Sequence, residues 1–287
     1  MRLPIDYKKL LIDRVIIITG AGRSGTTILG KLIGSMEPAY YLFEPSIMKF
    51  SQDVEALRAT IFEDYWLLQV QGRNINVNSH DDSFIWNYLP KHVFHPERED
   101  ALERMSRSKL VIKLTEYQPM INDMRHVFPG CKFVHIIRNG NDVVDSMCRR
   151  GWYTDEYMKT GFLDWVDNGA PWFIDDDSKL RWYGWNQETR AACVWRCSTE
   201  VGIRERGRLL TPHGDIFMAT YEDLIDYTSL LSEWLNLRPT ELTNQHALSI
   251  KEPKEHPNII DKIQQPERDK FLSLMGELGY GDMDNRP

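Results

Sequence analysis

The sequence predicts an α/β protein with a central parallel sheet of about five strands, flanked by helices in a three-layer sandwich. Short apolar runs rich in β-branched residues alternate with longer stretches of helical pattern. Continuous apolar runs are typical of strands that are buried on both faces, as in parallel sheets. A glycine-rich turn directly follows the first run, as expected for a strand–turn–helix unit. We expect all 287 residues to form one domain.

The expected strands carry the apolar runs of the chain. The first of them, RVIIITG, has five consecutive β-branched residues, and KLVIKL and KFVHII are also rich in apolar residues. In chain order, the strands are expected at Arg14–Gly20, Tyr40–Phe43, Lys109–Leu114, Lys132–Ile137 and Asp215–Thr220. Ligands of such sheets bind beyond the carboxyl ends of the strands, so the residues that follow each strand are candidates for a site.

The helices are expected between these strands and towards the C-terminus. The main ones are placed at about Thr26–Met36, Ser51–Gln71, Asn141–Arg150 and Asn186–Arg206. The rest of the C-terminal part is predicted to be helical and interrupted by prolines. Residues 151–185 show no clear period and are expected to form an insert or lid. This segment is rich in tryptophan and aspartate, including Trp152, Trp165, Trp172, Trp182, Trp185, Asp164, Asp167, Asp175, Asp176 and Asp177.

The charge balance and the apolar pattern exclude several classes of protein. There are 35 Lys and Arg against 42 Asp and Glu, a formal charge of −7. This argues against nucleic-acid binding, which needs a basic face. No apolar stretch approaches the length of a membrane-spanning helix, and the N-terminus does not resemble a secretory signal. We therefore expect a cytoplasmic protein with no membrane partner, and reduced thiols at Cys131, Cys148, Cys193 and Cys197.

The turn after the first strand is a candidate anion-binding loop. The segment Gly20–Thr27 (GAGRSGTT) follows the P-loop pattern, but Thr26 stands where the pattern has lysine. Glycines let the backbone N–H groups turn inward, and the helix N-terminus adds partial positive charge. Nucleoside triphosphate sites use that lysine on the β- and γ-phosphates. The cation here is Arg23, which suits a single 5′-phosphate carrying a bulky leaving group.

This loop resembles the 5′-phosphosulfate loop of sulfotransferases that use PAPS (3′-phosphoadenosine 5′-phosphosulfate). The form RSGTT is similar to that of the tyrosylprotein and carbohydrate branch of this family. The resemblance implies a P-loop-like α/β fold and PAPS as co-substrate, with adenosine 3′,5′-bisphosphate (PAP) as product and no metal. It also implies that the loop residues bind the nucleotide, namely Gly22, Arg23, Ser24, Gly25, Thr26 and Thr27.

The family needs a second anion site for the 3′-phosphate of PAPS. Arg138 ends the fourth expected strand, and Ser146 follows eight residues later in RNGNDVVDSMCRR. This Arg–Ser spacing is similar to the 3′-phosphate motif of the family, and Arg150 resembles a further basic residue on the same phosphate. Tyr221, at the end of the fifth strand, resembles a nucleotide-contacting tyrosine, although a buried core tyrosine is nearly as good an interpretation.

Three residues are candidates for catalysis. Glu44 in YLFEP resembles the base of the tyrosylprotein and carbohydrate branch, and Pro45 favours an extended backbone before it. Lys113 lies inside an apolar strand, where burial of its charged ammonium costs free energy unless it has a partner. The resemblance assigns it, together with Arg23, to stabilisation of the transferring sulfuryl group. A structural carboxylate and a surface lysine are the simpler alternatives, and Glu116 is a reserve base.

The leading interpretation is a PAPS-dependent sulfotransferase that acts on a hydroxyl or amine of a small molecule. Aromatic rings and carboxylates both attract cations, so residues 151–185 favour a small polar acceptor, including guanidinium-type natural products such as alkaloid toxins. A satellite core with a solvated acidic loop explains the same residues equally well. Carbohydrate or phenol O-sulfation is the alternative, and a P-loop nucleotide kinase or a non-catalytic nucleotide-binding module is more remote. A homodimer is left open.

Overall fold

The structure is a computed structural model that describes residues 14–43, 107–115, 121, 124–125, 128–159, 166–167, 170–171, 173–208, 215–250 and 256–281. Its centre is a five-stranded sheet in the order β2-β3-β1-β4-β7, and every neighbouring pair is parallel. The strands are β1 (Val15–Thr19), β2 (Ala39–Phe43), β3 (Lys109–Lys113), β4 (Lys132–Ile137) and β7 (Ile216–Thr220). The five strands expected from the sequence are confirmed.

The central strand β1 explains why the sheet forms. All five of its residues are buried, and Ile17 and Ile18 are completely inaccessible to solvent. β1 pairs with β3 on one side and with β4 on the other. The order of the strands therefore reverses at β1, and its carboxyl end opens at the crevice where α/β sheets bind ligands.

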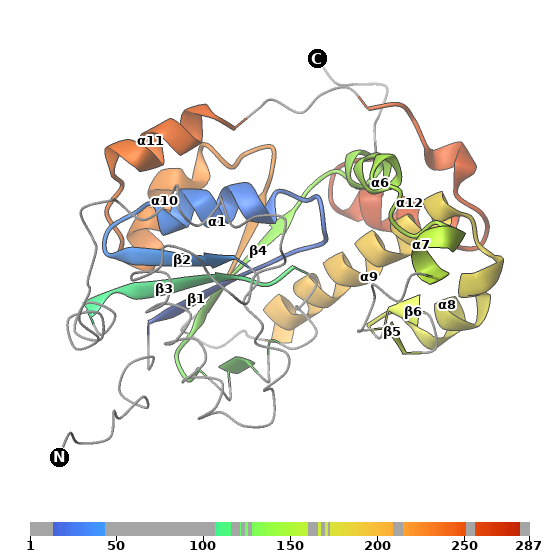
Figure 1. The fold of residues 1–287 in the computed structure, drawn as a ribbon, viewed down its shortest axis with the longest axis horizontal. Coiled ribbons are helices and arrows are strands. Elements are labelled where there is room, and N and C mark those ends of the chain that lie inside the picture. The colour runs from blue at the N-terminus through green and yellow to red at the C-terminus, as the bar shows by residue number, and fades with distance from the viewer. Residues whose placement is uncertain are drawn as a thin grey trace.

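One face of the sheet is covered by α1 (Thr26–Gly34), which contacts β2 and β3 and also packs against α10 (Tyr227–Leu235) and α11 (Glu241–Leu248) (Figure 1). Gly30 and Gly34 of α1 lie directly against the ring and Cβ of Tyr41. An added Cβ at either glycine would come within 2.4 Å of this side chain, so close packing requires both glycines.

The other face is covered by α9 (Gln187–Arg208). Ile136 of β4 contacts the loop that leads into α1, so the preceding residue, His135, points to the opposite face. There the ring of His135 lies against Gly202 of α9, and its Nδ1 is 2.9 Å from Thr19 Oγ1. With helices on both faces, the predicted three-layer arrangement is confirmed.

A second apolar cluster lies beside the sheet, where α9 packs against α6 (Gly140–Arg149) and α12 (Glu267–Glu277) (Figure 1). The ring centroids of Trp195 and Phe271 lie 5.0 Å apart in it. The helix predicted at Asn141–Arg150 corresponds to α6, and the one at Asn186–Arg206 corresponds to α9. The helix predicted at Ser51–Gln71 falls outside the described residues.

Residues 151–185 contain more regular structure than the sequence indicated. The described part forms α7 (Asp155–Lys159), β5 (Val166–Asp167), β6 (Ala170–Pro171), α8 (Asp176–Arg181) and a 3₁₀ turn, η5 (Trp182–Gly184). Trp182 and Trp185 are buried in the second apolar cluster. The aromatic side chains of these residues form part of a core, as the satellite-core alternative expects, and the insert or lid stays a prediction.

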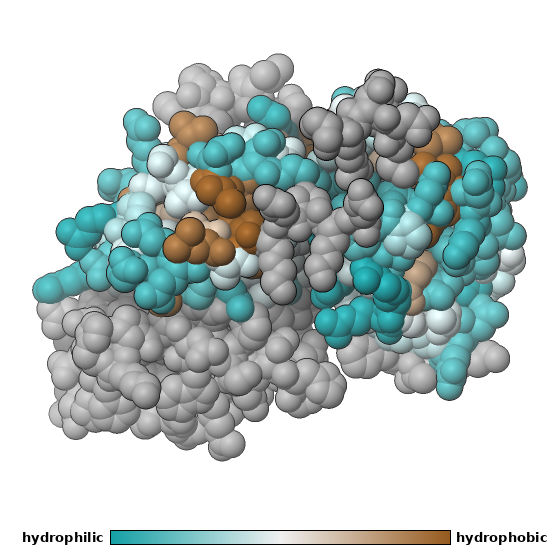
Figure 2. All heavy atoms as spheres, turned by 90° about the horizontal axis from the view of Figure 1, so that it is seen from above, coloured by the Kyte–Doolittle hydropathy of each residue, from teal (hydrophilic) through white to brown (hydrophobic). Residues whose placement is uncertain are grey.

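The C-terminal part is helical, as expected, with α10, α11, a 3₁₀ turn, η6 (Ile260–Lys262), and α12. The described surface of the view in Figure 2 is mostly hydrophilic, with hydrophobic side chains gathered in small groups. Among the residues with described coordinates, no helix combines the length and the apolar character needed to cross a bilayer.

Candidate nucleotide-binding site

The candidate site residues gather at the carboxyl ends of β1, β3, β4 and β7. The loop of residues 20–25 joins β1 to α1 and occupies the crevice at the reversal of strand order. Arg138 follows β4, and Tyr221 follows β7. The parallel sheet therefore brings together segments that are about a hundred residues apart in the sequence.

The loop after β1 has the tight geometry of an anion-binding turn. Gly20 has a φ of 152°, and a Cβ there would lie 2.6 Å from the carbonyl oxygen of Ile136. Gly25 has a φ of 97°, and a Cβ there would lie 2.5 Å from the ring of Tyr221. Arg23 also has a positive φ, 68°, which is uncommon for a residue other than glycine. The two glycines are required both for the turn and for the approach of neighbouring chain segments.

The remaining loop residues lie at the start of α1. Ser24 and Thr26 are buried, Gly22 is buried, and Thr27 is half-buried. Thr26 is the first residue of α1, so the position that holds lysine in nucleotide triphosphatases is here a short, buried hydroxyl side chain. The Ser24 Oγ is inaccessible to solvent and has no hydrogen-bond partner in the described part of the chain. A buried hydroxyl at a helix N-terminus suits an anionic oxygen.

Arg138 is held from several sides. Its guanidinium carbon lies 4.5 Å from the centroid of the Tyr221 ring, a cation–π contact. Its Nη2 lies 3.4 Å from Asp142 Oδ2. The Nε of Arg138 is buried and has no hydrogen-bond partner among the described residues. Tyr221 therefore has a structural role in packing against Gly25 and also supports the predicted phosphate-binding arginine.

Ser146 and Arg150 complete the predicted second anion site on α6. Arg23 Nε donates a hydrogen bond of 3.0 Å to Ser146 Oγ, so the loop and the second motif are in direct contact. Burial lowers the pKa of Arg23, and the positive charges of Arg150, Arg138 and Arg149 lower it further. Arg23 therefore lies close to three other guanidinium groups, and an anion beside it offsets this repulsion.

The donors of this region fit a nucleotide with separate 5′ and 3′ phosphate groups. The loop offers the helix N-terminus and the Ser24 hydroxyl, and α6 offers Ser146 and a cluster of arginines. Each group contains a buried polar atom with no hydrogen-bond partner among the described residues, Ser24 Oγ in one and Arg138 Nε in the other, and Asn139 Nδ2 beside Arg138 is a third. Ser24 Oγ and Arg138 Nε are donors, so each is available to an acceptor oxygen of a ligand.

The predicted catalytic lysine lies at the same edge of the sheet. Lys113 is the last residue of β3, is 5% exposed, and pairs in register with Ile18 of β1 and Phe43 of β2. The alternative of a lysine that reaches the surface is therefore wrong. Glu44 follows Phe43 in the sequence but lies outside the described residues, as does the reserve base Glu116.

The family model described as "Sulfotransferase family" matches residues 15–226. The chain belongs to the sulfotransferase family. Among solved structures, the sulfotransferase domain from the curacin biosynthetic pathway superposes with a TM-score of 0.56 and 17% identity, covering 94% of this chain and 99% of that one. The sulfotransferase domain from the olefin synthase of Synechococcus PCC 7002 gives a TM-score of 0.54 and 16% identity, covering 96% and 97%. These likenesses confirm the fold. No curated protein sequence matches the chain.

Sequence reasoning missed two residues of this sulfotransferase site, Arg149 and His256. Arg149 Nη2 lies 3.0 Å from Asp145 Oδ2 and 3.1 Å from His256 Nδ1. The signal for Arg149 was available, because it directly precedes Arg150. His256 gave no signal, because its contact with Arg138 spans 118 residues and depends on the path of the C-terminal segment.

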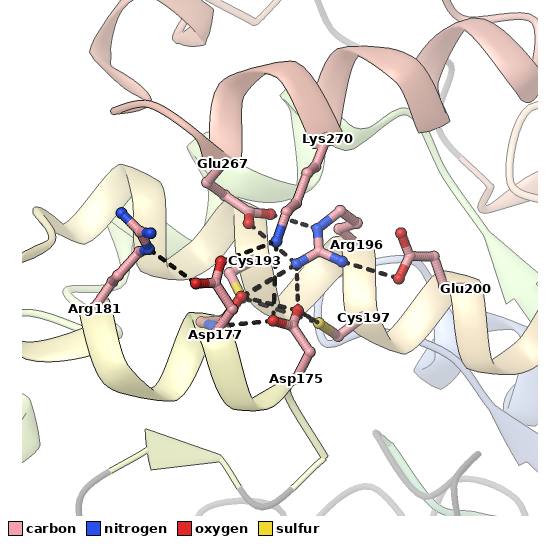
Figure 3. A network of polar contacts seen from close by, with 10 residues as sticks. Asp175, Asp177, Arg181, Cys193, Arg196, Cys197, Glu200, Glu267 and Lys270 are labelled. Atoms are coloured by element: carbon pink, nitrogen blue, oxygen red, sulfur yellow. Dashed lines mark hydrogen bonds and ion pairs between the residues drawn. The ribbon is translucent and has the colours of Figure 1, made fainter.

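Two aspartates of the predicted lid, Asp175 and Asp177, form ion pairs with cationic side chains of the sulfotransferase itself (Figure 3). Asp175 caps α8 through the Ser178 N–H and lies 2.8 Å from Arg196 Nη2. Asp177 pairs with Arg181 at 3.2 Å and with Lys270 at 3.5 Å. These two carboxylates already have cationic partners, so they do not act as free ligands for a cationic acceptor. Asp164, Trp165 and Trp172 lie outside the described residues.

Proposed function

We propose that this sulfotransferase transfers the sulfuryl group of PAPS to a hydroxyl or amine of a small polar acceptor and releases PAP. The observation that carries the proposal is the contact between the two anion-binding motifs, Arg23 Nε to Ser146 Oγ at 3.0 Å. One motif suits the 5′-phosphosulfate and the other suits the 3′-phosphate. Membership of the family supports this interpretation over a nucleotide kinase.

PAPS supplies an activated sulfuryl group on the oxygen of its 5′-phosphate. In the proposed reaction the acceptor oxygen or nitrogen forms a bond to sulfur while the bond from sulfur to the phosphate oxygen breaks. The leaving oxygen gains negative charge. We assign its stabilisation to the N-terminus of α1, the Ser24 hydroxyl and the Arg23 guanidinium. Preorganised donors of this kind are typically the largest contribution to such catalysis.

Lys113 and Glu44 are proposed to act on the transferring group and on the acceptor. Lys113 ends β3 beside the carboxyl end of β1, so its ammonium is proposed to neutralise charge on the sulfuryl oxygens. Glu44 is proposed to take the proton of the attacking hydroxyl or amine. In the sequence it directly follows Phe43, the residue that pairs with Lys113.

The acceptor is proposed to be a small polar metabolite. The specific preference for a guanidinium-type cation stays a prediction, and it loses part of its basis because Asp175 and Asp177 already pair with Arg196, Arg181 and Lys270. The two solved structures named above are the sulfotransferase domains of the curacin biosynthetic pathway and of an olefin synthase. A hydroxyl-bearing intermediate of natural product biosynthesis is therefore included among the candidate acceptors.

A product screen tests the proposal. The protein is incubated with PAPS and separate panels of cationic, phenolic, sugar and aliphatic hydroxyl acceptors, and mass spectrometry detects products that gain one SO₃ together with PAP. We expect PAP and a sulfated product to form in equal amounts with at least one panel. Tight PAP binding with no transfer to any acceptor would favour a non-catalytic nucleotide-binding module instead.

A further inference from the structure

The C-terminal segment after α11 returns to the start of α6. Asn141 Nδ2 donates to the carbonyl oxygen of Pro257 at 3.1 Å, and its Oδ1 accepts from the Ile259 N–H at 3.0 Å. Asn141 is 2% exposed, so both hydrogen bonds are protected from water. They fix the backbone on the C-terminal side of His256 against the helix that carries Ser146.

His256 lies between a carboxylate and the predicted 3′-phosphate arginine. Its Nδ1 is 2.6 Å from Asp145 Oδ2, and its Nε2 is 3.5 Å from Arg138 Nη2. The side chains of His256 and Asp145 are each 8% exposed. The same carboxylate oxygen lies 3.0 Å from Arg149 Nη2. The imidazole is therefore packed among Asp145 and Arg149 of α6 and Arg138 at the end of β4.

The shorter of two contacts favours one tautomer of His256. Nδ1 lies 2.6 Å from an acceptor, Asp145 Oδ2, and 3.1 Å from a donor, Arg149 Nη2, so the closer carboxylate favours a hydrogen on Nδ1. In the neutral ring, Nε2 then has a free lone pair, which faces the Nη2 donor of Arg138. This orientation turns one edge of the guanidinium towards His256 and Asp142, while the buried Nε has no partner.

We propose that His256 is a positioning residue for Arg138, and that Asp145 orients His256 for this purpose. The inference rests on the proposed function, because it assigns Arg138 to the 3′-phosphate. Asp142 and His256 hold the guanidinium at its Nη2 edge, and the Tyr221 ring lies against its face. A side chain that is already ordered loses less conformational entropy when the phosphate binds, so the affinity for the 3′-phosphate rises.

The test compares two nucleotides that differ only in the 3′-phosphate. Isothermal titration measures the affinities of the full-length protein for PAP and for adenosine 5′-phosphate. His256→Ala is expected to weaken PAP about three- to tenfold, the worth of one hydrogen bond, and to leave adenosine 5′-phosphate within about twofold. His256→Gln, which keeps an acceptor for Arg138, is expected to restore most of the PAP affinity. His246→Ala, on α11, is the control and is expected to change neither affinity.

A double-mutant cycle with Arg138→Ala separates the inference from the proposed function. If His256 acts through Arg138, His256→Ala has no further effect on PAP in the Arg138→Ala background. Equal losses in both backgrounds, or equal losses for both nucleotides, would overturn the positioning role while the proposed function stands. If Arg138→Ala itself does not discriminate between the nucleotides, the 3′-phosphate assignment fails, and the inference fails with it.

Discussion

Arg23 is the residue that most clearly distinguishes this loop from a nucleoside triphosphate site. It is the only positively charged residue of the loop sequence, and Thr26 stands where the P-loop pattern has lysine. Burial and three neighbouring arginines lower its pKa, so the folded protein holds like charges together. The hydrogen bond of Arg23 to Ser146 also links the loop to α6. Charge repulsion of this kind is typical of a site built for an anion.

A substitution at Glu44 tests the assignment of the base. Glu44→Gln keeps the size of the side chain but removes its ability to accept a proton. Turnover is expected to fall about 10²–10⁴-fold, the usual worth of a general base, while PAP affinity stays unchanged. Steady-state kinetics with a fixed acceptor and titration with PAP provide the two measurements. Normal turnover in the variant would show that Glu44 is not the general base, and Glu116 would be the next residue to test.

At the scale of elements, the ion pairs around Arg196 join α8, α9 and α12 (Figure 3). Arg196 Nε lies 2.6 Å from Glu267 Oε1, and its Nη2 lies 2.8 Å from Asp175 Oδ2. Glu267 is fully buried. Burial raises the pKa of Glu267, whereas Arg196 and Ser178 hold the pKa of Asp175 well below its usual range despite the opposing effect of its partial burial. The network stabilises the part of the molecule that the sequence suggested was a lid.

Removing Arg196 is expected to be strongly destabilising. Arg196→Met keeps much of the side-chain volume but leaves Glu267 buried without its partner. The free energy of unfolding is expected to fall by about 3–5 kcal/mol, as for other broken buried ion pairs. Chemical denaturation measures this loss. The matched control is Arg181→Met, whose ion pair with Asp177 is half-exposed, and this variant is expected to change stability by less than about 1 kcal/mol. Equal losses in the two variants would contradict the account.

The elements that the sequence predicted well are those with local signals. The strands follow from β-branched runs such as Val15–Thr19, and the site loop follows from glycine spacing at a strand end. The structure of residues 173–185 could not be predicted, because its ion pairs and aromatic packing involve α9 and α12. Arg196 and Glu267 are 71 residues apart, and Asn141 and Pro257 are 116 apart. A sequence pattern within one segment cannot predict contacts between residues so far apart in the chain.

At the scale of the whole molecule, burial of His135 makes the free energy of unfolding depend on pH. Complete burial lowers the pKa of His135 from 6.5 to about 4. The unfolded chain therefore binds a proton on this side chain between these pH values while the folded protein does not. The free energy of unfolding is expected to fall as the pH drops from 6.5 towards about 4, and the contribution is fully present above 6.5.

The comparison that isolates this contribution uses His135→Gln. Glutamine keeps a polar group within reach of Thr19 but does not titrate. Denaturant unfolding at a series of pH values gives the pH dependence of stability for both proteins, and groups common to both cancel in the difference. The variant is expected to lose stability less steeply than the wild type over this range. Identical slopes would show that the pKa of His135 is the same in the folded protein and in the unfolded chain.

The central claim is that one edge of the sheet holds two phosphate groups at once. The most direct measurement is the ratio of affinities for PAP and adenosine 5′-phosphate, in the wild type and in Arg138→Ala. Charge-assisted hydrogen bonds contribute about 1.5–3 kcal/mol, so the wild type is expected to prefer PAP by at least about tenfold. Arg138→Ala is expected to lose most of this preference while its affinity for adenosine 5′-phosphate stays nearly unchanged. Equal affinities in the wild type, or an unchanged preference in the variant, would contradict the account.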